Sequence, residues 1–181
     1  MTICVFGGAD QHVDEVYFAL AEALGRALAE RGHSLIFGGG GSGMMGAVAR
    51  GAASGGAHIT GVAPRFFDKP GVFSPLCTEF ILTDTMAQRK TIMESRGDAF
   101  IALPGGIGTF EEIYEVITLC QLGQLCKPVA FLDTLGYWDE AVALVEKAVS
   151  CGFTRRNVRE RFGRFTDVGK CLDYCEGKIL P

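Results

Sequence analysis

The sequence lacks any apolar run of about 18 residues, which is the length that a membrane-spanning helix needs. It also begins with the apolar stretch MTICVF, without the basic region and small-residue cleavage site of a secretory signal. These absences predict a protein without a membrane segment or a secretory leader. The cytoplasm is therefore the expected location.

Positive charge is scarce for a nucleic-acid-binding protein, since 17 Lys and Arg against 21 Asp and Glu give a net charge of −4. A duplex-binding protein needs a basic stripe that replaces the counterions of the phosphates. The densest basic segment has five arginines between Arg155 and Arg164, but Glu160 interrupts it and no ladder of aromatic residues runs through it. This pattern favours a solvated helix face, and we do not expect nucleic acid as a partner.

Disulfide and metal-ligand patterns are absent as well. The seven cysteines are an odd number, contain no C-x-x-C pair and mostly fall in apolar segments, as reduced core thiols do. The three histidines, His12, His33 and His58, are not grouped with cysteines or with one another at ligand spacing. We expect no metal site.

Glycine is abundant, with 25 residues that mostly end short apolar or β-branched runs, as in an α/β fold. The runs are nearly continuous, which is typical of parallel strands covered on both faces. A chain of 181 residues buries roughly 70% of its unfolded surface, enough for one core. Residues 1–181 are thus predicted to form a single domain with a Rossmann-like, doubly wound parallel sheet and helices on both faces. The predicted strands are 3–6, 34–37, 58–62, 79–82, 99–103 and 129–132; the predicted helices are 14–30, 43–54, 85–96, 109–122, 137–149 and, in the tail, 169–176.

The first motif is the glycine run at residues 37–46, which leaves a predicted strand and opens a helix. It contains G-x-G-x-x-G, but dinucleotide binding also needs an acidic residue at the end of the next strand, and that strand ends in Val62-Ala63-Pro64. Six glycines in nine positions exceed what a turn needs, which favours close approach of the backbone to a ligand. The proline-rich loop 64–75 is expected to lie over this cleft.

The second motif, at residues 103–112, brings glycine amides and the Thr109 hydroxyl to the start of a helix. Unpaired amides and the helix dipole make such a start an anion site that suits phosphate. The motif lacks the lysine of a P-loop, so triphosphate hydrolysis is not expected. The spacing from Thr109 to Glu112 is also that of a capping box, and the spacing alone favours this interpretation of Glu112. On the helical wheel, however, Glu112 lies at the border of the apolar stripe, which also suits catalysis.

The third motif is the helix that begins near Thr85. Arg89 falls inside its apolar arc, between Met86 and Ile92. An inward guanidinium is costly unless an anion meets it. Geometry alone leaves this open, because the side chain can also reach the surface and pair with an acid there.

Together the three motifs resemble the LONELY GUY family of cytokinin-activating phosphoribohydrolases, over roughly residues 3–153. The family pattern P-G-G-x-G-T-x-x-E is matched by residues 104–112 and M-x-x-R-K by residues 86–90. The pattern G-G-G-x-x-G-L-M-G is matched by residues 38–46, with Met44 in place of leucine.

The resemblance implies hydrolysis of the N-glycosidic bond of a nucleoside 5′-monophosphate, AMP or N6-prenylated AMP, to the free base and ribose 5-phosphate. It implies no cofactor, a homodimer, and Arg89 with Glu112 as the catalytic pair, which reverses the preference for a capping box. Glu112 would stabilise the oxocarbenium ion and activate water or attack the sugar itself. The implied substrate-binding residues are Gly8, Gly39, Gly40, Gly43, Met86, Lys90, Gly105, Gly106, Gly108, Thr109 and Glu115.

The sequence departs from the family where C-G-S-S is usual, because it has Gly7-Gly8-Ala9-Asp10 instead. This replacement leaves the base and ribose specificity open. The main alternative is a binding protein that resembles molybdenum-cofactor carriers and holds a phosphate-bearing ligand without turnover. Some family members have been labelled lysine decarboxylases, but Lys90 lies beside an arginine on a helix, and the sequence shows no partners for pyridoxal phosphate.

Overall fold

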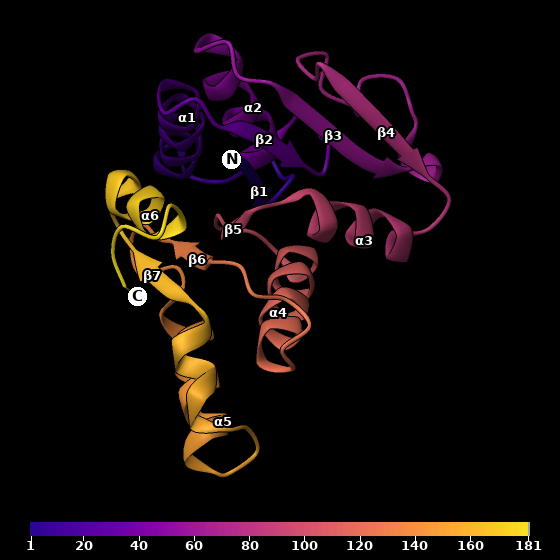
Figure 1. The fold of residues 1–181 in the computed structure, drawn as a ribbon. Helices are drawn as coiled ribbons and strands as arrows, with labels where there is room; N and C mark the ends of the chain where they lie inside the picture. The colour runs from indigo at the N-terminus through magenta and orange to yellow at the C-terminus, as the bar shows by residue number, and fades with distance from the viewer. Residues whose placement is uncertain (181) are drawn as a thin grey trace.

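The computed structural model describes residues 1–180, which form one sheet of seven parallel strands (Figure 1). The order across the sheet is β4-β3-β2-β1-β5-β6-β7, so the predicted doubly wound α/β fold is confirmed. In chain order the strands are β1 (Thr2–Phe6), β2 (Ser34–Phe37), β3 (Ile59–Pro64), β4 (Glu79–Thr83), β5 (Ala99–Ala102), β6 (Val129–Leu132) and β7 (Gly163–Phe165).

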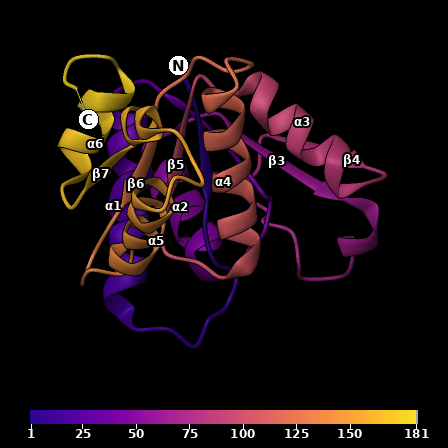
Figure 2. The same cartoon turned by 90° about the horizontal axis from the view of Figure 1, so that it is seen from below.

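Helices cover both faces of this sheet (Figure 1). One face carries α1 (Glu15–Glu30), α2 (Gly43–Ser54) and α6 (Val168–Cys175). The other carries α3 (Met86–Arg96), α4 (Ile107–Gln121) and α5 (Asp139–Ser150), and Figure 2 shows α4 and α5 side by side in front of the sheet. Two 3-10 helices, η1 (Arg65–Phe67) and η2 (Arg156–Arg161), lie in the connections.

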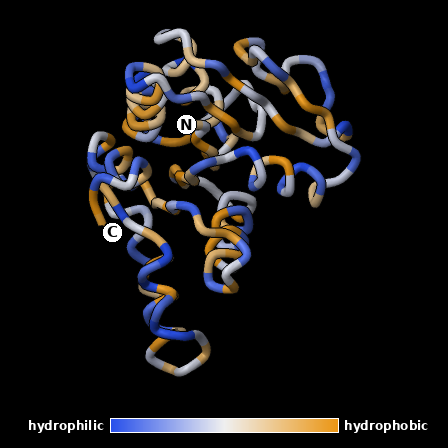
Figure 3. The backbone as a smooth tube through the Cα atoms, viewed as in Figure 1, coloured by the Kyte–Doolittle hydropathy of each residue, from blue (hydrophilic) through white to orange (hydrophobic). Residues whose placement is uncertain are grey.

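The alternation of side chains along β1 produces the two apolar layers. Ile3 and Val5 are buried against α1 and α2, whereas Cys4 and Phe6 are buried in the layer with α3 and α4. Hydrophobic and hydrophilic segments alternate along the helices (Figure 3), as expected where one face of a helix packs on a core. Within residues 1–180, no helix combines the length and the apolar character that crossing a membrane requires.

β1 and β5 are neighbours at the centre of the sheet, where the strand order reverses. Ile3 pairs with Leu35 of β2 on one side and with Ala99 of β5 on the other. The connections that follow β1 and β5 therefore lead to helices on opposite faces, and ligands of doubly wound sheets bind in the crevice between such connections.

The structure corrects the prediction in the C-terminal tail. The predicted helix is present as α6, but the strand β7 was missed because three residues with Arg164 at their centre carry no strand pattern. The basic segment does form a helix, the 3-10 helix η2, yet Arg164 lies beyond it in β7 and pairs with Asp133. Arg164 thus pairs with a buried carboxylate and is not part of a solvated helix face.

Candidate functional site

Three glycine-containing turns meet at the carboxyl ends of β1, β2 and β5. The N–H of Gly8, which follows β1, donates to the carbonyl of Pro104, which follows β5, at 3.1 Å. The N–H of Met44, in the first turn of α2, donates to the carbonyl of Gly8 at 2.8 Å. These bonds join the first and second sequence motifs into one site around Gly8.

The amino end of α4 presents backbone amides to open space. The helix begins at Ile107, two residues earlier than predicted, with Gly106 as its N-cap residue and no side-chain cap. A Cβ atom built on Gly106 or Gly108 has no neighbour within 4 Å among the described residues. Free amides at the positive end of a helix dipole attract anions, and phosphate fits such a site.

Thr109 lies in the first turn of this helix and is 4% exposed. Its side chain packs beneath Gly105, because a Cβ atom on Gly105 would lie 2.1 Å from the Thr109 hydroxyl and 2.7 Å from the nitrogen of Gly8. Glycine is therefore required at position 105 for the close approach of the two turns. At position 106, by contrast, the protein itself leaves room for a side chain.

The capping-box interpretation of Glu112 is wrong. A capping box needs Thr109 at the N-cap position, but that position belongs to Gly106. The carboxylate of Glu112 instead accepts a hydrogen bond from the guanidinium of Arg89. The two residues that the family resemblance makes catalytic thus form an ion pair between α3 and α4.

The side chain of Arg89 points inward. The helical wheel had left open whether it does so or reaches the surface to pair with an acid there. The residue is 7% exposed and Glu112 is 8% exposed. The Nε of Arg89 donates to the carbonyl of Val62 at 3.0 Å, and its guanidinium lies against Gly38, where a Cβ atom would be only 2.6 Å from a terminal nitrogen. The glycine run after β2 therefore makes room for the arginine as well as for any ligand.

The buried position of Glu112 changes its acidity. Burial raises the pKa of the Glu112 carboxyl, and the neighbouring Arg89 guanidinium opposes this rise without cancelling it. A carboxyl group with a raised pKa beside a fixed cation is suited to hold or transfer a proton at a reacting centre.

Lys90 is the next residue on α3, and it also contacts α4. Its ammonium pairs with both Glu111 and Glu115. Burial alone would lower the pKa of Lys90, but the bonds to the two carboxylates outweigh burial and raise it. Lys90 is therefore held as a cation, and Glu115 is occupied by it. Met86, at the start of α3, is 37% exposed.

The glycine run contacts the loop between β3 and β4. The N–H of Ser74 donates to the carbonyl of Gly39 at 2.8 Å, and Gly40 forms a β-bridge with Phe73. Gly39 has a positive φ of 75°, and Gly43 has one of 60° where it packs against the backbone of Ala9. The loop predicted to lie over the cleft thus lies on the predicted ligand-binding turn. Because β3 ends at Pro64, the acidic residue that dinucleotide binding needs is missing there.

Two hollows flank these elements. One of about 220 Å³ lies beside the α4 turn and is lined by Tyr17, Met44, Tyr137 and the backbone at Gly8 and Gly105. Sequence reasoning missed both tyrosines, although Tyr137 closely follows the carboxyl end of β6, where ligand-binding residues of this fold gather.

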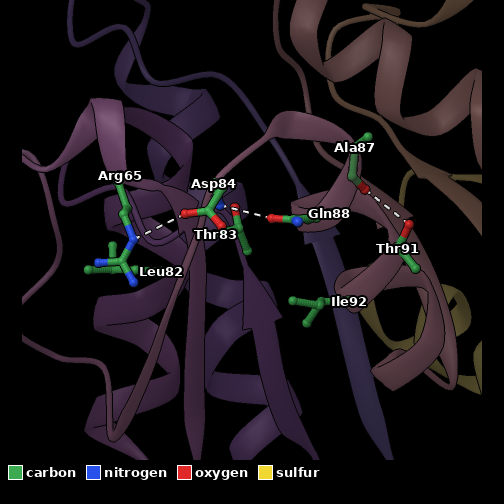
Figure 4. Close-up of a pocket in the computed structure, with 8 residues that line it drawn as sticks. All are labelled: Arg65, Leu82, Thr83, Asp84, Ala87, Gln88, Thr91 and Ile92. Atoms are coloured by element: carbon green, nitrogen blue, oxygen red, sulfur yellow. Dashed lines mark hydrogen bonds and ion pairs between the residues drawn. The ribbon is translucent and has the colours of Figure 1, made fainter.

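The other hollow, of about 430 Å³, lies on the outer side of α3 (Figure 4). Arg65 and Asp84 pair across it at 3.3 Å, and the N–H of Asp84 donates to Gln88 at 2.9 Å. Neither Arg89 nor Glu112 is among the residues that line either hollow.

Gly105→Ala and Gly106→Ala form a matched pair of variants at the turn before α4. We expect Gly105→Ala to lower the free energy of unfolding by about 1–3 kcal/mol, because its methyl group overlaps Thr109 and Gly8. Gly106→Ala, with φ of −90°, should change stability by less than about 0.5 kcal/mol and should weaken mononucleotide binding. Urea unfolding and ligand-dependent melting shifts measure the two effects. Equal stability losses would contradict the geometry of the turn.

Comparison with known proteins adds independent evidence. A family model described as "Possible lysine decarboxylase" matches residues 45–175. The chain is 41% identical over 157 residues to the cytokinin riboside 5′-monophosphate phosphoribohydrolase LOG2 of Arabidopsis thaliana, covering 87% of this chain and 74% of that protein. It is also 41% identical over 158 residues to LOG4 of the same plant, with the same coverage.

Solved structures share the fold. The molybdenum cofactor carrier protein of Chlamydomonas reinhardtii superimposes with a TM-score of 0.74 at 24% identity, over 98% of this chain and 96% of that chain. At this identity the similarity concerns the fold alone.

Proposed function

This chain belongs to the LONELY GUY family, and on that premise we propose that it hydrolyses the N-glycosidic bond of a nucleoside 5′-monophosphate, AMP or N6-prenylated AMP. The products are the free base and ribose 5-phosphate. One observation carries the proposal: Glu112, which is buried and paired with Arg89 of α3, lies about one helical turn beyond the uncapped amides on α4.

In this proposal two parts of α4 bind two parts of the substrate. The amides of Gly106 and Gly108 and the side chain of Thr109 receive the 5′-phosphate, which fixes the sugar at a distance from the reacting bond. Glu112 then faces the anomeric carbon C1′. Gly8, Gly39, Gly40 and Gly43 complete the substrate contacts in the proposal, together with Met86, Lys90, Gly105 and Glu115.

The reaction needs charge stabilisation at both ends of the breaking bond. As the bond from C1′ to the base nitrogen breaks, its electron pair goes to the base and positive charge develops on the ribose ring; the base takes up a proton, so that water supplies OH to C1′ and, overall, H to the base. The Glu112 carboxylate stabilises that positive charge, and it either takes the proton of the attacking water or bonds to C1′ before water does. Arg89 holds Glu112 in place and supplies positive charge to substrate oxygens.

Incubation with AMP tests the activity directly. We expect free adenine and ribose 5-phosphate in equal amounts, resolved by liquid chromatography, and faster turnover of one member of a panel of 5′-monophosphates. If AMP and its N6-prenylated forms bind but release no base, the chain is a carrier of phosphate-bearing ligands, which is the alternative that the sequence left open.

The description of the matching family model points to a different reaction, the decarboxylation of lysine. A lysine that forms a Schiff base is activated by a lowered pKa, whereas the two carboxylates around Lys90 raise its pKa. Lys90 is therefore unsuited to that chemistry.

We further propose a cytoplasmic homodimer. Exposed apolar side chains at the two ends of α4 and on α5 support an interface there. Ile107 and Leu122, at the ends of α4, are 80% and 65% exposed, and Leu144 on α5 is 64% exposed. The seven free cysteines, all within residues 1–180, suit a reducing compartment. Light scattering should give twice the mass of the chain.

A further inference from the structure

The loop between β6 and α5 reaches across to the phosphate-binding turn. Its residue Tyr137 donates its hydroxyl hydrogen to the carbonyl oxygen of Gly105. A tyrosine hydroxyl is protonated and able to donate at neutral pH, and burial raises the pKa of Tyr137 further. No part of the mechanism above uses this residue.

A buried ion pair holds the start of the loop. Asp133 is completely buried, and the Nε of Arg164 on β7 donates to its carboxylate at 2.6 Å. The same guanidinium contacts Asp139 at the start of α5, so that Arg164 connects the two ends of the loop. The N–H of Asp133 also donates to the carbonyl of Phe165 at 2.8 Å. A buried carboxylate is costly unless it is paired, which makes the loop depend on Arg164.

The backbone of the loop is held in an unfavourable conformation. Leu135 has a φ of +57° and Gly136 a φ of +72°, and Leu135 is the only non-glycine residue with positive φ among residues 1–180. The Leu135 side chain is 73% exposed, so its own packing does not enforce this conformation. The turn directs Trp138 into the core, where its indole N–H donates to the carbonyl of Leu132 at 3.3 Å, and directs Tyr137 to Gly105.

The bond to Gly105 fixes the direction of the next amide. The carbonyl of Gly105 and the N–H of Gly106 belong to one planar trans peptide unit, so they point in opposite directions. With glycine on both sides, this unit would otherwise rotate with little steric hindrance. Because Tyr137 holds the carbonyl of Gly105, the N–H of Gly106 is fixed in the opposite direction, away from the Tyr137 hydroxyl. The same bond polarises the peptide and strengthens the N–H as a donor.

We propose that Tyr137 is a positioning residue that aims the Gly106 amide at the 5′-phosphate of the substrate, and that Arg164 acts through Tyr137 by holding the loop. The inference rests on the proposed function for the identity of the phosphate. It gives the short strand β7 a functional role at a distance from the reacting bond.

Tyr137→Phe tests the inference, because it removes only the hydroxyl. We expect the KM for AMP to rise about tenfold with kcat changed less than twofold. The contact of the Gly106 amide with the phosphate, which Tyr137 positions, stabilises the ground state and the transition state alike. The affinity for ribose 5-phosphate, measured by calorimetry, should fall by the same factor, whereas kcat/KM for adenosine, which has no phosphate, should stay the same. Arg164→Lys keeps the charge but not the forked geometry of the guanidinium. It should raise the KM for AMP and lower the affinity for ribose 5-phosphate, both by less than Tyr137→Phe does.

Tyr114→Phe is the matched control. It removes a hydroxyl that donates to a backbone carbonyl in the same way, to Ala141 at 3.1 Å, between α4 and α5. This variant should lose a similar amount of stability and keep both the KM and the affinity for ribose 5-phosphate. If Tyr137→Phe behaves like Tyr114→Phe, or lowers kcat alone, the positioning role is wrong.

The outcomes also separate this inference from the proposed function. A wild-type protein that turns over AMP while Tyr137→Phe is unchanged overturns the positioning role only. A wild-type protein that releases no base overturns the proposed function, and the affinity for ribose 5-phosphate then still decides on Tyr137.

Discussion

Glu112→Gln is expected to reduce the kcat of nucleotide hydrolysis at least about a hundredfold and to leave the fold intact. The amide has the size of the carboxyl group but neither stabilises a cation nor takes a proton. Glu112 lies beside Arg89 at the inner end of the site, and no other carboxylate among the described residues pairs with that guanidinium. The loss should therefore appear in kcat more than in KM.

The pH dependence gives this prediction a second readout. Burial raises the pKa of Glu112, so kcat/KM of the wild type should fall on the acid side at a pH above the usual range of a glutamate. The residual activity of Glu112→Gln should lack this acid limb. For stability the sign is opposite: a raised pKa favours the protonated group in the folded state, and this contribution is lost as the pH rises through the folded-state pKa.

Glu146→Gln on α5 is a matched control, because it breaks the Glu146–Arg159 ion pair at the surface. It should keep full activity and change stability by no more than about 1 kcal/mol. A Glu112→Gln protein that unfolds at lower denaturant but hydrolyses AMP at the wild-type rate would show that the carboxylate has a structural role only.

The sequence predicted the central elements of the fold because their signals are local. Short apolar or β-branched runs marked the six longer strands, and the family resemblance implied that Arg89 and Glu112 act as a pair, which the structure brings together. The last strand depended on contacts between distant segments. β7 forms by pairing with β6, where Phe131 lies opposite Arg164, and the ion pair of Arg164 with Asp133, 31 positions away, supports this pairing.

The capping box shows a different limit. A threonine three residues before a glutamate is a local pattern, and it predicted the start of α4 at Thr109. The true start at Ile107 follows from tertiary contacts, since Thr109 is needed beneath Gly105 and Glu112 has a stronger partner in Arg89. The local spacing was therefore misleading, because Glu112 pairs with Arg89 on another helix and does not cap its own helix.

Removal of the 5′-phosphate from the substrate is expected to lower kcat/KM by roughly 10²- to 10³-fold, because the phosphate supplies binding energy that holds the sugar over Glu112. Adenosine and AMP share the base and the reacting bond, so their ratio measures the phosphate contacts alone. In Gly106→Ala the added methyl group enters the space before the uncapped amides, and the preference for AMP over adenosine should shrink severalfold while the rate with adenosine stays unchanged. Ribose 5-phosphate should inhibit hydrolysis of AMP competitively. If the wild type cleaves adenosine as readily as AMP, the amino end of α4 does not bind the phosphate, and Glu112 would have to act on a sugar held by other contacts.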